Sequence, residues 1–221
     1  MSRVRQIALI SLLLLSCTAQ AKPPKQGGSG QPGVFDYYAL SLSWAPNFCA
    51  SHSDPNECGP GKQFGFVVHG LWPQYAQGYP QSCSTQKITP EQQAKYGPVY
   101  ASPGLITHEW AKHGTCSGLQ PAEYFDLTAK LKQQIVIPDA YVRPTTPLRV
   151  SNADFAQAFK AANPGLADNG VLPFCSGGGR FLQETHICYD KSGKSQSCSP
   201  AEVKSSSKSC GQASFLLQNV K

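Results

Sequence analysis

The sequence predicts a single α+β domain in which a central antiparallel β-sheet is covered by several helices. Strand-like alternation of apolar and polar residues occurs near both ends of the chain, and segments with helical signals occupy its middle; this distribution is typical of antiparallel sheets with helices on their faces. After residue 21 the chain holds eight cysteines, an even number that suggests about four disulfides. The 200 residues that follow residue 21 are enough for one domain with a substantial core.

Residues 1–21 have the features of a secretory signal peptide. Arg3 and Arg5 form a basic start, residues 7–15 form an apolar run too short to cross a membrane, and Ala19-Gln20-Ala21 is a small-residue cleavage site. A weaker alternative is a lipoprotein signal in which Cys17 is lipidated. We expect a secreted or periplasmic protein in an oxidising compartment, with no membrane attachment once the signal is removed.

Residues 22–34 are rich in Pro, Gly, Ser, Gln and Lys, and we expect them to form a flexible lead-in. The folded domain is expected to span residues 35–221. Within it, Phe35–Trp44 alternates in a way that predicts a half-buried strand. Gln63–Val68 predicts a second strand, which ends at His69 and is followed by a loop rich in Pro and Gly.

Helices are predicted next, and strands return near the C-terminus. The first predicted helix starts at Ser102-Pro103 and ends at Gly114 or Gly118. The second covers Ala122–Ile135, and the third covers Phe155–Ala162 after an N-cap at Ser151. The predicted strands are Val171–Phe174, Arg180–Tyr189 and Phe215–Val220.

Charge and cysteine spacing restrict the function only weakly. The formal net charge of +6 falls to +4 when residues 1–21, with two of the basic residues, are removed, and this mild excess suits a polyanionic partner without requiring one. No C-x-x-C pair is present, which disfavours a zinc ribbon.

We interpret four lysines of the Ser-rich C-terminal region as part of a solvated hairpin and loop rather than an RNA-tracking surface: Lys191, Lys194, Lys204 and Lys208.

The stretch HEWAKH at residues 108–113 differs by one residue from H-E-x-x-H, the zinc-protease signature. That signature needs its two histidines four residues apart on one helical face, whereas His108 and His113 are five apart and separated by about 140°. Lys112, at about 40° from His108, would also repel a cation. Both arguments exclude a zinc site of this type.

The same stretch places four ionisable groups on one arc of a helix. Glu109 lies at about 100° from His108, whereas Trp110 and Ala111 fall outside the arc and can face the core. Two potential cations, a carboxylate and a titratable base suit the stabilisation of an anionic transition state. The alternative is a solvated helix face with ordinary contacts between neighbouring side chains.

A second segment, FGFVVHGLWP at residues 64–73, places His69 at a strand end near Trp72. HGLWP followed by HEWAKHGTC resembles the two active-site segments of the ribonuclease T2 family, and LSLSWAPNFC at residues 40–49 resembles that family's first core strand. The resemblance implies an endoribonuclease that cleaves single-stranded RNA without a metal or other cofactor. The ribose 2′-OH attacks phosphorus to give a 2′,3′-cyclic phosphate, which can open to a 3′-phosphate, and DNA, which lacks this hydroxyl, is not cleaved.

The resemblance also implies residue roles. His113 matches the general base, His69 the general acid and His108 the phosphate-binding histidine. Glu109 and Lys112 match the residues that stabilise the pentacoordinate intermediate. Spacing alone leaves open which histidine is base and which is acid.

The residues implied for base binding match the family less completely than the catalytic residues do. Trp72 matches an aromatic base platform, with a core role as the equal alternative, and Tyr75 or Tyr79 is expected to complete the base pocket. Gln74 replaces an acidic residue found in some relatives, and Leu105 and Ile106 replace aromatic residues found in many. These departures leave the base preference and a second stacking site open. Because stacking on an aromatic platform is tolerant of sequence, we expect low base specificity.

The family pattern further implies four disulfides, where the cysteine count alone permits 105 pairings. The implied pairs are Cys49–Cys58, Cys83–Cys116, Cys175–Cys210 and Cys188–Cys198. Of the remaining histidines, His52 is expected to be exposed and His186, which alternates with Glu184 and Cys188, to be structural.

Two other functions compete with the endoribonuclease, which we expect to be a monomer that binds single-stranded RNA. A noncatalytic RNA-binding or toxin-like protein could keep the fold, but it has no need of both proton-transfer groups. A metal-dependent nuclease needs an acidic cluster for Mg²⁺, and the sequence offers none.

Overall fold

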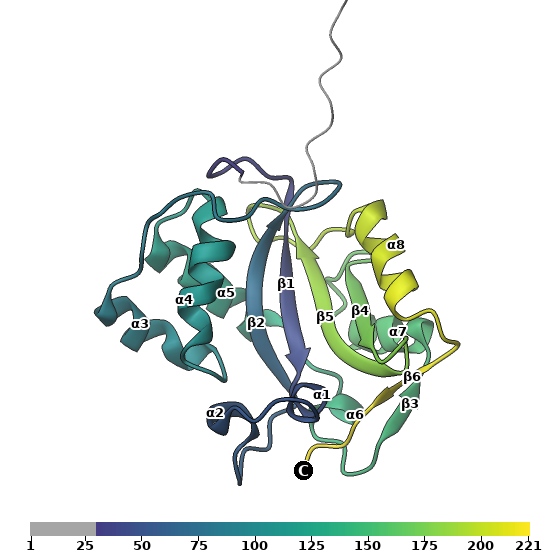
Figure 1. Cartoon of the computed structure of the whole chain (residues 1–221). Helices are drawn as coiled ribbons and strands as arrows, with labels where there is room; N and C mark the ends of the chain where they lie inside the picture. Colours follow the sequence, from purple (N-terminus) through teal and green to yellow (C-terminus); the bar gives the residue numbers. More distant parts are fainter. Residues whose placement is uncertain (1–29) are drawn as a thin grey trace, which may run out of the picture.

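The computed structural model describes residues 30–221, so the predicted signal peptide lies outside the described residues. Its centre is a six-stranded sheet in the order β2-β1-β5-β6-β3, with β4 also paired to β5 (Figure 1). All of its strand pairs are antiparallel except for one parallel contact between β5 and β6, and the predicted α+β class is confirmed. The strands are β1 (Tyr37–Trp44), β2 (Phe66–Gln74), β3 (Leu148–Val150), β4 (Val171–Ser176), β5 (Phe181–Tyr189) and β6 (Phe215–Leu217).

Helices flank this sheet on both sides. In Figure 1, α3 and α4 lie beyond β2, whereas α8 lies beside β4 and β5. The helices are α1 (Ala45–Cys49), α2 (Pro55–Cys58), α3 (Pro90–Tyr96), α4 (Leu105–Lys112), α5 (Pro121–Gln134), α6 (Asp139–Val142), α7 (Asn152–Ala162) and α8 (Pro200–Ser209). Within residues 30–221, every helix is too short or too polar to cross a bilayer.

Strand β1 is buried on both faces, and the prediction of a half-buried strand was wrong in this respect. Leu40 and Leu42 belong to the main core, as the alternation predicted. On the other face, Tyr37 and Ala39 pack in a second cluster with Leu172. This cluster includes Val203 of α8, so the helix that closes this face is one the sequence prediction did not contain.

Helix α8 occupies part of the region predicted as a hairpin and loop, and this prediction was wrong for Lys204 and Lys208. The Ser199 hydroxyl caps the helix by accepting a hydrogen bond from the backbone N–H of Glu202, and Pro200 takes the first helical position. Ser-Pro-x-Glu is a helix-start signal that could have revealed it.

The helix that carries HEWAKH is shorter than predicted. It begins at Leu105, and His113 is its C-cap, followed by the 3₁₀ turn Gly114–Cys116. Trp110 is buried as expected, but Ala111 is exposed, contrary to the prediction that it faces the core. His52 is exposed as predicted.

All four disulfides implied by the family pattern are present. Cys83–Cys116 ties the loop after β2 to the turn after α4. The described part of the predicted flexible lead-in is attached to the same turn, since Gly33 N–H donates a 2.9 Å hydrogen bond to the carbonyl of Cys116. The ordered domain therefore begins before Phe35.

Candidate active site

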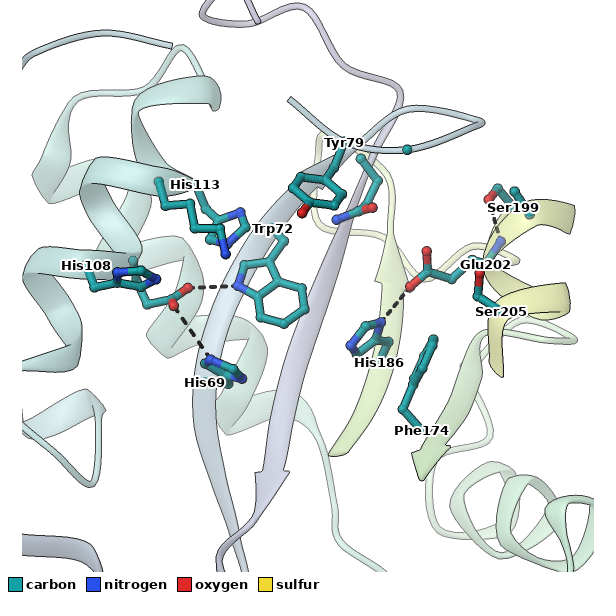
Figure 2. A pocket seen from close by; sticks show the side chains of 15 residues that line it. His69, Trp72, Tyr79, His108, His113, Phe174, His186, Ser199, Glu202 and Ser205 are labelled. Carbon is teal, nitrogen blue, oxygen red and sulfur yellow. Dashed lines mark hydrogen bonds and ion pairs between the residues drawn. The ribbon is translucent and has the colours of Figure 1, made fainter. Parts of the chain in front are cut away.

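A cavity of about 500 Å³ lies over one face of the sheet, with β2 and α4 on one side and β4, β5 and α8 on the other (Figure 2). Four of the five predicted catalytic side chains approach it from α4 and its C-cap, and the fifth from β2. The lining residues are His69, Trp72, Gln74, Gly78, Tyr79, His108, Glu109, Lys112, His113, Phe174, His186, Ser199, Ala201, Glu202 and Ser205.

A β-bulge places His69 in this cavity. His69 lies within β2 rather than at its end, which corrects the prediction. In the pairing with β1, Val68 lies opposite Leu42 and Gly70 opposite Ser41, so His69 is the additional residue. Side chains three apart in a regular strand point to opposite faces. The additional residue of the bulge shifts this alternation by one, so the side chains of His69 and Trp72 point to the same face of the sheet. Their ring centroids are 5.0 Å apart.

Trp72 connects the strand motif to the helix motif. Its indole Nε1–H donates a 2.7 Å hydrogen bond to Oε2 of Glu109. The Glu109 carboxylate lies directly over Gly70, because a Cβ at that position would overlap it. The glycine of HGLWP thus makes room for the glutamate of HEWAKH.

The two histidines at the ends of the helix segment differ in exposure. His108 is exposed at the cavity rim, whereas His113 is buried. The ring of His113 stacks on Trp72 with centroids 5.0 Å apart and an angle of 23° between the planes. Its Nδ1 is buried and has no hydrogen-bond partner within residues 30–221.

His113 and His69 experience opposite electrostatic environments. Burial, together with the positive charge of Lys112, lowers the pKa of His113 to about 3. Burial also acts to lower the pKa of His69, but the hydrogen bond and charge of Glu184, with the charge of Glu109, outweigh it and the pKa is raised. At neutral pH His113 is a neutral imidazole that can accept a proton, and His69 more readily holds one.

Glu109 lies between these histidines with an unusual pKa. Burial raises the pKa of its carboxyl to about 7, although the charge of His69 and the hydrogen bond from Trp72 oppose the shift. Its Oε1 has no hydrogen-bond partner within residues 30–221 and lies 3.8 Å from Nε2 of His69. A carboxyl group that titrates near neutral pH is a frequent feature of active sites.

The far wall of the cavity contains residues that the sequence prediction did not assign to the site. His186, predicted to be structural, lines the cavity beside Phe174, and its Nδ1 lies 2.5 Å from Oε1 of Glu202. Its Nε2 lies 3.2 Å from Glu184 on the same strand. The alternation of Glu184 and His186 was the available signal, but their neighbours come from distant parts of the chain.

The expected base-binding residues separate into two groups. Trp72 and Tyr79 line the cavity, and Tyr79 is partly exposed with its ring 6.1 Å from that of His113. Tyr75 does not line the cavity; it packs against the main core, because its neighbour Gln74 points to the cavity side of β2. The proposal of Tyr75 as a base-binding residue is therefore withdrawn.

Comparison with known proteins adds an independent observation. The sequence model of the Ribonuclease T2 family matches residues 35–198. The chain belongs to the ribonuclease T2 family. This confirms the resemblance that the two motifs carried, and as a ribonuclease T2 protein the chain is an endoribonuclease.

Curated relatives and solved structures agree with this membership. The chain is 36% identical to a ribonuclease of Aeromonas hydrophila over 97% of this chain and 98% of the relative, and 29% identical to ribonuclease I of Escherichia coli over 83% and 85%. Its fold is similar to an RNase-related protein from Calystegia sepium (TM-score 0.67, 22% identity, covering 85% and 98%). It is also similar to a ribonuclease MC1 variant in complex with 5′-UMP (TM-score 0.58, 22% identity, covering 73% and 91%).

Proposed function

We propose that this ribonuclease T2 protein cleaves single-stranded RNA by metal-free transphosphorylation in the cavity over β2 and α4. The 2′-oxygen of a ribose forms a bond to the adjacent phosphorus, and the bond from phosphorus to the 5′-oxygen of the next nucleotide breaks. The products are a 2′,3′-cyclic phosphate and a free 5′-hydroxyl. In a second step a water oxygen forms a bond to phosphorus, the bond from phosphorus to the 2′-oxygen breaks, and a 3′-phosphate with a free 2′-hydroxyl results.

The observation that carries this proposal is that the rings of two histidines flank Trp72, each with its centroid 5.0 Å from the indole, in environments that shift their pKa values in opposite directions. His113, whose pKa is lowered to about 3, is neutral and removes the proton of the 2′-OH. His69, whose pKa is raised, donates its proton to the departing 5′-oxygen. Environments that separate two pKa values in this way support an assignment of base and acid, which spacing alone had left open.

The remaining residues of the helix motif act on the phosphate. Lys112 lines the cavity as a cation, and its charge contributes to the lowered pKa of both His108 and His113. We assign Lys112 and His108 to the non-bridging oxygens, where negative charge develops in the transition state. Glu109, held by Trp72, lies within reach of His69 and stabilises the pentacoordinate intermediate.

For base binding we propose Tyr79 as the stacking surface and Trp72 as the wall behind it. One face of Trp72 is already occupied by His113, whereas Tyr79 is partly exposed. Stacking on an aromatic ring tolerates any base, which fits low base specificity. The solved relatives include ribonuclease MC1 variants in complex with 5′-UMP and with 5′-GMP.

Further parts of the proposal concern substrate range and location. Because the nucleophile belongs to the substrate, DNA is not cleaved, and we propose that the protein acts as a monomer. Four disulfides are consistent with an exported protein in an oxidising compartment, either secreted or periplasmic.

One digestion tests the mechanism. The protein and its His113→Ala variant are incubated with single-stranded RNA and, separately, single-stranded DNA in excess EDTA, and new 3′ ends are identified by mass spectrometry. We expect cyclic phosphates from RNA with the unmodified protein, none with the variant, and no cleavage of DNA. Activity lost on chelation would indicate a metal-dependent nuclease, and intact RNA with a folded protein would indicate a noncatalytic RNA-binding protein.

A further inference from the structure

Along the floor and far wall of the cavity, four ionisable side chains form a continuous hydrogen-bonded array, which starts at His69 on β2. Nδ1 of His69 lies 3.1 Å from Oε2 of Glu184, and Oε1 of Glu184 lies 3.2 Å from Nε2 of His186. Nδ1 of His186 then lies 2.5 Å from Oε1 of Glu202 on α8. The array joins β2 to β5 and α8, and His69 and Glu184 are 115 residues apart in the sequence.

We propose, on the basis of the proposed role of His69 as general acid, that Glu184 is a positioning residue that holds the His69 ring with Nδ1–H directed to the carboxylate and Nε2 directed to the cavity. The ring nitrogen bound to a carboxylate carries a fixed proton, so the exchangeable proton is at the other nitrogen. In His69 that other nitrogen, Nε2, is on the side of Glu109, at 3.8 Å from its Oε1. Nε2 is thus the atom that gives its proton to the leaving oxygen.

Glu184 is suited to this role because both oxygens of its carboxylate are held by hydrogen bonds. Oε2 accepts from the hydroxyl of Ser41 at 3.0 Å as well as from His69, and Oε1 accepts from His186. The carboxylate therefore cannot rotate without breaking bonds on both oxygens. A histidine held by it is restrained in the same way as the imidazole of a Ser-His-Asp triad is restrained by its aspartate.

The remainder of the array keeps Glu184 ionised despite burial. Burial alone raises the pKa of this carboxyl, but hydrogen bonds from His186 and His69, and their charges, outweigh it and hold the pKa well below its usual range. His186 is itself protonated between two carboxylates, which raise its pKa to about 9 against the effect of burial. With His69 protonated, two cations alternate with two carboxylates, so the array is neutral before the proton is given up.

Other charges also face His69 and contribute to its titration. From α4, Glu109 raises the pKa of His69, whereas the positive charge of His186 on β5 lowers it. His69 is also close enough to influence the titration of Glu57, His108 and His113. Within residues 30–221, Glu184 differs from these groups because its carboxylate is hydrogen-bonded to the His69 ring.

The test separates proton donation to the leaving group from all other steps. Two substrates are compared: a dinucleoside phosphate, whose 5′-oxygen must be protonated to leave, and the 3′-(4-nitrophenyl phosphate) of the same nucleoside, whose nitrophenolate leaves without a proton. A Glu184→Gln variant is expected to lose about 10- to 100-fold in kcat on the dinucleoside phosphate, below the loss from removing the acid itself. On the nitrophenyl ester it retains nearly the full rate. The alkaline limb of its pH–rate profile moves to lower pH, because His69 loses its negative neighbour.

Two further variants serve as controls, one for the role of His69 as acid and one for the stability of β5. His69→Ala is expected to show the same pattern with a larger loss, and equal losses on both substrates would overturn the assignment of His69 as acid independently of Glu184. Thr185→Val removes a buried 3.0 Å hydrogen bond to Leu172 on the opposite face of the same strand, so it controls for destabilisation of β5 and should leave the ratio of the two rates unchanged. Equal losses on both substrates with Glu184→Gln, or none, would refute the positioning role.

A measurement on the unmodified protein covers the case in which Glu184→Gln does not fold. Nitrogen-15 NMR of labelled histidine identifies which ring nitrogen carries the proton above the pKa of His69. We expect the proton at Nδ1, facing Glu184. A proton at Nε2 with Nδ1 free would contradict the proposal.

Discussion

The indole Nε1–H of Trp72 donates a 2.7 Å hydrogen bond to Oε2 of Glu109. Trp72 belongs to HGLWP on β2 and Glu109 to HEWAKH on α4, 37 residues later. This bond joins the two motifs into one unit, with Gly70 below the carboxylate and His113 stacked on the indole. The tryptophan therefore has a polar role in addition to any contact with a base.

Replacing Trp72 by phenylalanine tests that polar role. Trp72→Phe keeps an aromatic surface beside His113 but removes the hydrogen bond that helps to keep Glu109 ionised. A hydrogen bond to a charged group contributes about 1.5–3 kcal/mol, so kcat/KM on a dinucleoside phosphate should fall about tenfold or more. Trp110→Phe is the matched control, because the indole of Trp110 donates to the carbonyl of Gln86 away from the cavity. Equal kcat/KM in the two folded variants would contradict the prediction.

The second prediction concerns the glycine of HGLWP. A Cβ added in Gly70→Ala overlaps the Glu109 carboxylate and must displace it or the indole that holds it. Displacement of a catalytic group by about 1 Å can cost about 100-fold in rate, and we expect a loss of this order in kcat with little change in the fold seen by circular dichroism. Gly104→Ala at the N-cap of α4 meets no atom within 4 Å and should keep full activity. A Gly70→Ala variant as active as Gly104→Ala would show that Glu109 tolerates the shift.

The third prediction concerns stability against pH. The pKa of His186 in the fold is about 9, above its ordinary value of 6.5. Because protonated His186 is favoured in the fold over the unfolded chain, its charge stabilises the fold fully below pH 6.5, and this stabilisation is lost as the pH rises towards 9. Urea unfolding at several pH values should therefore show the difference in unfolding free energy between the unmodified protein and His186→Gln shrinking from pH 6.5 to 9. A difference that stays constant across this window would mean that His186 is not protonated in the fold.

The fourth prediction compares two disulfides. Cys83–Cys116 closes a separation of 33 residues and Cys49–Cys58 one of 9, so loss of loop entropy from the unfolded chain suggests stabilisation by about 4 and about 3 kcal/mol. Paired Cys→Ala variants should show this order in urea unfolding. Only the variant lacking Cys83–Cys116 should also lose activity, since this bridge ties the loop after β2 to the end of α4. Full activity without it would show that the hydrogen bond from Ser82 N–H to the Lys112 carbonyl holds the loop unaided.

Local sequence was sufficient for features whose signals lie within a few residues. The existence of strand β1, the Ser151 cap of α7 and the apolar position of Trp110 depend on signals within one element, and each is present in the structure. Helix α8 shows the limit: its capping signal at Ser199 was present, but two lysines and four serines within it left no apolar face that would separate a helix from a loop.

The sequence by itself determined the family and the five residues of the catalytic motifs, because HGLWP and HEWAKHGTC are local patterns that can be read without knowledge of the fold. Tertiary structure alone decided where the side chains of these residues lie and in which direction their pKa values shift. Strand pairing created the bulge that turns His69 towards Trp72. Burial and charges from β2, α4 and β5 shifted the pKa values of His113 and His69 in opposite directions. Both effects depend on which distant elements meet and exclude water, and a pKa is set by those surroundings rather than by neighbours in the chain.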